Sequence, residues 1–144
     1  MSRRPIEYFL FDILVALLKI EYVANEFTYA DQLKHDFKSW DSIIREFEIV
    51  GEATKHLIDA CFFEQNKRRI VNFRNHVVHE YFGIDEEEVW HIIYEHLPLF
   101  KEEVVSHIGN IDSPLKSELI NAFNYENRNL TFITTYLTTL EENI

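Results

Sequence analysis

The scarcity of chain-breaking residues is the strongest constraint on the fold of this sequence. Its 144 residues contain only three glycines and three prolines, which leaves too few turn signals for a sheet of many strands. Apolar residues instead recur every three or four positions, for example at Phe9, Ile13 and Leu17, and this is the spacing of one face of a helix. The chain is therefore expected to fold into long helices.

Residues 1–108 are predicted to form an all-α, antiparallel bundle of four to five helices, with one hydrophobic core. The second long helix is expected to be capped by Ser39 or Asp41. Asp85, ahead of three glutamates, marks the start of another helix, which Pro98 is expected to kink or end.

The composition changes at Gly109. Residues 109–144 are expected to be a helical C-terminal extension that packs on the bundle or on a dimer partner. The threonine-rich stretch 131–139 also permits a strand, because β-branched side chains are compatible with both structures.

The net charge of −11 argues against a protein that grips nucleic acid over its whole surface. Lys67, Arg68 and Arg69 form a small basic group, interpreted either as a contact to an RNA backbone or as a solvated loop. No uncharged stretch is long enough to span a bilayer and no signal peptide is evident. We therefore expect a cytoplasmic protein with no membrane contact.

The segment from Arg74 to Tyr81 concentrates reactive side chains. Arginine binds phosphate and histidine transfers protons near neutral pH, so Arg74 and His79 suit cleavage of RNA, with Asn75 positioning either group. Histidine would take the proton of a ribose 2′-hydroxyl while arginine stabilises the phosphate. This chemistry needs no metal and no cofactor, and the histidines lack a metal-binding spacing.

Helix geometry limits what one copy of this segment can do. Arg74 and His79, five residues apart, leave a regular helix in directions about 140° apart. Two copies crossing in a symmetric homodimer could share one groove. The alternative is that Arg74 and His79 are ordinary surface residues.

Three segments carry a resemblance to a known family: Arg74-Asn75-x-x-x-His79-x-Tyr81 with the following Phe82–Asp85, Phe9–Leu14, and Ile49–Leu57. Together they resemble the HepT-like proteins, the HEPN-domain toxins of HepT/MNT toxin–antitoxin systems, over roughly residues 3–107. The segment 62–70 is shorter than is typical of the family, and residues 109–144 match nothing known in it.

The resemblance implies a homodimeric, metal-independent endoribonuclease toxin of a type II/VII-like toxin–antitoxin pair. Arg74, His79 and Asn75 match the catalytic positions, and the substrate would be a transfer or messenger RNA. Tyr81 matches the tyrosine that a cognate MNT nucleotidyltransferase modifies by AMPylation. Glu52 could hold an arginine or histidine of the motif in place.

Gly51 costs about 1 kcal/mol of helix propensity relative to alanine, which favours close packing of another helix at that point.

The alternative to a ribonuclease is a non-catalytic nucleotide-binding or accessory subunit that partners a minimal nucleotidyltransferase.

Overall fold

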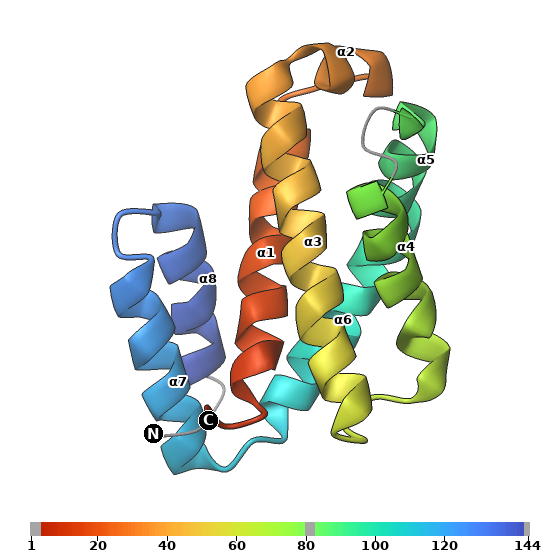
Figure 1. Cartoon of the computed structure of the whole chain (residues 1–144). Coiled ribbons are helices and arrows are strands. Elements are labelled where there is room, and N and C mark those ends of the chain that lie inside the picture. The colour runs from red at the N-terminus through yellow and green to blue at the C-terminus, as the bar shows by residue number, and fades with distance from the viewer. Residues whose placement is uncertain (1–3, 80–82, 143–144) are drawn as a thin grey trace.

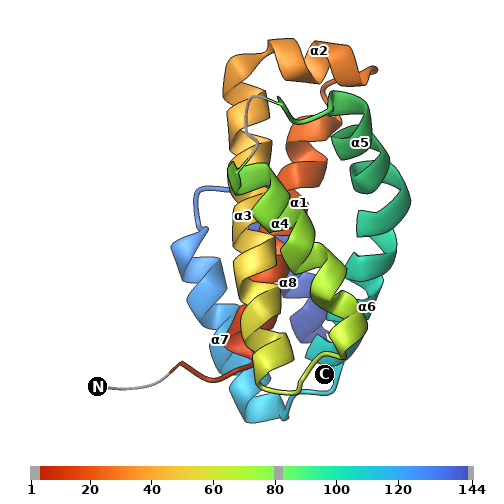
Figure 2. The same cartoon turned by 45° about the vertical axis from the view of Figure 1, so that its right-hand side comes forward.

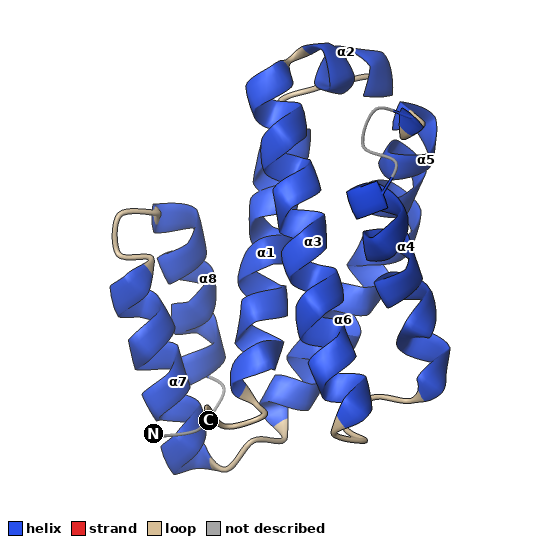
Figure 3. Cartoon of the chain, viewed as in Figure 1, coloured by secondary structure: helices blue, strands red, loops and turns tan. Residues whose placement is uncertain are grey.

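The computed structural model describes residues 4–79 and 83–142, and all regular structure within these ranges is helical (Figure 3). This confirms the predicted all-α fold. The helices are α1 (Tyr8–Ala24), α2 (Ala30–His35), α3 (Phe37–Asp59), α4 (Arg68–His79), α5 (Glu86–His91), α6 (Leu97–Gly109), α7 (Ser113–Glu126) and α8 (Thr131–Glu142). A 3₁₀ turn, η1 (Gln65–Lys67), precedes α4, and a π-helical segment, η3 (Ile92–His96), joins α5 to α6.

Helix α1 is the centre of the molecule. It packs against α3 and α6 on one side and against α7 and α8 on the other (Figure 1). Its residues Leu10, Phe11, Ile13 and Ile20 are fully buried. A helix that is apolar over most of its circumference must be surrounded by protein, and this explains its place.

The start of α3 differs from the prediction. Neither Ser39 nor Asp41 caps it; Asp36 does, and its carboxylate accepts a hydrogen bond from the backbone N–H of Ser39 at 3.1 Å. The extended backbone of Asp36 places its side chain over the free N–H groups of the first turn. The cap predicted at Asp85 is confirmed, because its carboxylate accepts from the N–H of Glu87 at 3.0 Å.

Pro98 interrupts the helix that begins at Glu86. The chain widens into the π-helical segment η3 just before this proline and resumes as α6 with Pro98 in its first turn. Proline has no N–H and its ring clashes with the carbonyl four residues earlier, so a regular helix cannot pass through. Helices α5 and α6 thus follow one bent path beside α4 (Figure 2).

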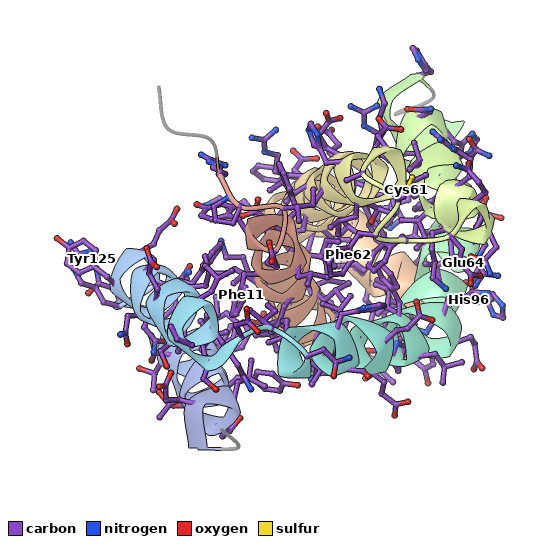
Figure 4. All side chains as sticks on the ribbon, turned by 90° about the horizontal axis from the view of Figure 1, so that it is seen from below. Phe11, Cys61, Phe62, Glu64, His96 and Tyr125 are labelled. Atoms are coloured by element: carbon purple, nitrogen blue, oxygen red, sulfur yellow. The ribbon has the colours of Figure 1, made fainter. Side chains whose placement is uncertain are left out.

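Helices α7 and α8 form a hairpin against α1 (Figure 1). Phe11 stacks on Phe123 of α7 with ring centroids 5.3 Å apart, and it lies between α1 and the hairpin in Figure 4. The threonine-rich stretch is helical: Ile133 and Leu137, one turn apart, are fully buried, while hydroxyl groups such as that of Thr138 donate to the preceding turn.

None of the helices in the described ranges combines the length and the apolar character that crossing a bilayer demands.

Candidate functional site

Helix α4 carries the candidate site and packs along α3. Val71 and Val77 are buried on its inner face. Gly51 of α3 is buried directly against Arg74, which confirms the close packing predicted at this glycine. This contact determines where the guanidinium group of Arg74 lies.

Two neighbours hold the guanidinium group of Arg74. One terminal nitrogen donates to Oδ1 of Asn75 at 2.7 Å, and the other donates to Oε2 of Glu52 at 2.5 Å. Nε of Arg74 is buried and has no hydrogen-bond partner among the described residues. The side chain is 28% exposed, so a ligand can still reach part of the group.

The other oxygen of Glu52 extends this arrangement along α3. It lies 3.6 Å from Nε2 of His56, and the His56 ring stacks on Phe9 with centroids 4.5 Å apart. Glu52 therefore lies between a basic group of α4 and an imidazole of its own helix. The sequence reasoning did not include His56 in the site, although the Glu52–His56 spacing of four residues places both on one helix face.

His79 occupies the last turn of α4 and is exposed. Because α4 is helical from Arg68 to His79, Arg74 and His79 diverge by about 140° and are separated by about 7.5 Å along the axis. A single helix thus presents a positioned arginine and an exposed imidazole without directing them at one small group. Tyr81, the predicted modification site, lies outside the described residues.

The basic group at the start of α4 divides into paired and unpaired residues. Lys67 forms an ion pair with Glu103 at 2.9 Å. Arg68 lies 3.8 Å from Asp59. Arg69 is exposed and has no ion pair within the part of the chain that the structure describes, so it is the most available of the three for a phosphate.

The described residues contain no group of three or more histidine, cysteine, aspartate or glutamate side chains arranged to hold a metal ion.

An all-helical bundle that presents arginine, asparagine and histidine from one helix is HEPN-like in architecture. The family model described as "Ribonuclease HepT-like" matches residues 13–106, and the chain belongs to this family. The matched residues include Glu52, Arg74, Asn75 and His79 and end before α7.

Several relatives agree with this assignment. A Methanocaldococcus jannaschii protein named "Putative RNase" is 32% identical over 108 residues, which cover 72% of this chain and 97% of the relative. A second "Putative RNase" of that organism is 30% identical, over 78% of this chain and 94% of its own. The "Probable ribonuclease HepT" of Thermococcus cleftensis is 31% identical, over 69% and 92% respectively. No solved structure matches the chain significantly.

Proposed function

We propose that this protein is a metal-independent endoribonuclease in which Arg74 binds the scissile phosphate and His79 transfers the proton. The observation that carries the proposal is the anchoring of Arg74 by Asn75 and Glu52, with an exposed histidine five residues later on the same helix. Membership of the HepT-like ribonuclease family supports it.

The proposed reaction uses the RNA's own hydroxyl as nucleophile. His79 takes the proton of the ribose 2′-hydroxyl, and the 2′-oxygen attacks the adjacent phosphorus. Arg74 stabilises the additional negative charge on the phosphate oxygens. The bond from phosphorus to the 5′-oxygen breaks, and that oxygen takes up the proton that His79 accepted from the 2′-hydroxyl. The products are a 2′,3′-cyclic phosphate and a 5′-hydroxyl.

Glu52 and Asn75 are positioning residues in this proposal. Arginine has a planar group with donors in fixed directions, and the two contacts fix the plane of the Arg74 guanidinium. The remaining donors are left for the phosphate. Glu52 also offsets part of the charge of Arg74, so RNA must compete with it for the same group.

The active unit in this proposal is a homodimer. The divergence of Arg74 and His79 on α4 supports it, because a phosphate between two α4 helices could reach Arg74 of one copy and His79 of the other. The substrate is a cellular RNA, either transfer or messenger RNA.

The ribonuclease activity is proposed to be regulated through Tyr81, two residues beyond His79. A cognate MNT nucleotidyltransferase would attach AMP to the hydroxyl of Tyr81, and the chain would serve as the toxin of this pair. Each attached AMP would add a negatively charged phosphate two residues along the chain from His79, and this charge would compete with the RNA backbone for the basic groups of the site.

Purified protein tests the reaction directly. Cleavage of RNA should persist in EDTA and disappear in His79→Ala and Arg74→Ala, while the exposed Arg45→Ala control should cleave normally. Cleavage that requires a metal, or that survives His79→Ala, would contradict the mechanism. Expression alone should arrest growth, and Arg74→Ala should relieve the arrest; a harmless wild-type protein would instead favour the non-catalytic accessory subunit.

A further inference from the structure

A groove lies on the flank of α4 that faces away from Glu52. Its volume is about 550 Å³, which is within the range of small-molecule sites. Five residues of α4 line it: Arg69, Ile70, Asn72, Phe73 and His76. At 100° per residue these side chains span about 160° of the helix circumference, and Arg74 lies outside that arc.

The floor of the groove is aromatic. Phe73 meets Phe47 of α3 edge to face, with ring centroids 5.1 Å apart, and Phe100 of α6 closes the far side. Phe47 and Phe100 are buried, whereas Phe73 is only half-buried. A partly exposed aromatic side chain on an apolar floor is a surface on which a planar base can stack.

The two ends of the groove differ in charge. At the α4 N-terminal end, Glu103 is neutralised by Lys67 at 2.9 Å, and Arg69 remains as an exposed cation. At the other end, Glu88 of α5 and His76 line the wall. Arg69 and His76 are seven residues apart, which is about 10 Å along the helix.

We propose that this groove binds one nucleotide of the RNA substrate, close to the scissile phosphate. Arg69 binds its phosphate, Phe73 stacks on its base, and Glu88 accepts a hydrogen bond from an exocyclic amino group of that base. The inference rests on the proposed ribonuclease function and assigns a specificity to it. Adenine, cytosine and guanine carry such an amino group and uracil does not, so a uridine is disfavoured here.

His76, which lines the groove, lies close along α4 to His79, the residue proposed to transfer the proton. His76 precedes His79 by three residues, or slightly less than one helical turn. The bound base therefore belongs to a nucleotide adjacent to the cleaved bond or near it. His96, another lining residue, lies at the outer edge of the molecule in Figure 4, so the groove opens to solvent there.

RNA binding by the otherwise complete His79→Ala protein tests the inference without cleavage. Oligoadenylate should bind about tenfold more tightly than oligouridylate of equal length. Arg69→Ala should weaken binding of both about tenfold, and Glu88→Ala should remove the preference. The matched controls Arg45→Ala and Glu118→Ala, at exposed positions outside the groove, should leave affinity and preference unchanged.

Each contrary outcome has a distinct meaning. RNA binding that is insensitive to Arg69→Ala, or a preference that persists in Glu88→Ala, would overturn the groove assignment even if the enzyme cleaves RNA. If Arg69→Ala weakens the binding of AMP but not of RNA, the groove is a site for a free nucleotide. If Arg69→Ala dissociates the dimer and leaves the affinity for RNA unchanged, the groove is a contact between subunits. A protein that binds RNA as described but never cleaves it would refute the proposed function and leave the groove intact.

Discussion

Gly51 of α3 and Arg74 of α4 touch so closely that only glycine fits between the helices. A β-carbon built on Gly51 would lie 2.2 Å from Cβ of Arg74 and 2.5 Å from its Cγ. These atoms sit next to the α4 backbone, so they cannot move aside without moving the helix. The contact brings the next residue of α3, Glu52, within reach of the guanidinium group.

Gly51→Ala should therefore damage both the fold and the site. Alanine favours a helix by about 1 kcal/mol over glycine, but overpacking of this kind typically costs about 1–3 kcal/mol. We expect a net loss in the free energy of unfolding, measured with urea, and at least a tenfold loss of RNA cleavage. Gly109→Ala is the control, since a β-carbon there meets nothing within 4 Å. Equal stability of the two variants would contradict the close-packing argument.

Glu52→Ala should separate catalysis from stability. The Glu52 side chain is 48% exposed, and such surface pairs contribute about 0–1 kcal/mol, so the unfolding midpoint should hardly change. A released Arg74 should lower kcat about tenfold, while KM for RNA stays equal or falls because a negative charge is gone.

The conservative variant and a matched control complete that measurement. Glu52→Gln keeps an oxygen that accepts from Arg74 and should recover part of the lost kcat. Glu48→Ala removes another glutamate of α3, one that pairs with Arg45 at 3.6 Å, and should leave kcat unchanged. A kcat for Glu52→Ala equal to that of wild type would exclude Glu52 as a positioning residue.

Local patterns in the sequence predicted much of this molecule. Helical spacing indicated the all-α fold, the Asp85 cap depended only on neighbouring residues, and the divergence of Arg74 from His79 follows from helix geometry. Gly51 also predicted close packing, because a mid-helix glycine is costly without such a reason.

Features that depend on how helices meet were not predictable in this way. The pairing of Glu52 with Arg74 joins residues 22 apart in sequence. The family resemblance implied that Glu52 could hold an arginine or histidine of the motif, but no local pattern identified Arg74 as that residue, because the contact depends on the approach of α3 and α4 at Gly51. The groove likewise arises from the separation of α4 and α6, which no local pattern encodes. Asp36 was missed as a cap because the backbone turn between α2 and α3 selects it over the nearby Ser39 and Asp41.

Leu137→Ala should show how strongly α8 is bound to the bundle. Leu137 is fully buried, and truncation of such a leucine typically costs about 2–5 kcal/mol. We expect a loss of that size in the free energy of unfolding, with a single transition if the hairpin unfolds together with the bundle. Thr138→Ala, at an exposed position of the same helix, should cost less than about 1 kcal/mol. Equal effects of the two substitutions would mean that α8 does not contribute to the core.

Asp12 of α1 gives the protein a stability that depends on pH. Burial raises the pKa of this carboxyl from 3.8 to about 6; Arg4 opposes the shift and Glu126 adds to it. The folded state therefore holds the proton more tightly than the unfolded chain, so stability declines as pH rises from about 4 through 6 and is level above that.

Asp12→Asn removes this ionisation and should stabilise the protein at neutral pH. A difference of two pKa units corresponds to about 3 kcal/mol, and solvent screening at this partly exposed position reduces the expected gain to roughly 1 kcal/mol. Urea unfolding of both proteins at pH 4 and pH 7.5 measures the effect. The advantage of Asp12→Asn should be small at pH 4 and reach its full size at pH 7.5, whereas an advantage that is constant or shrinks with rising pH would show that Asp12 is not the group responsible.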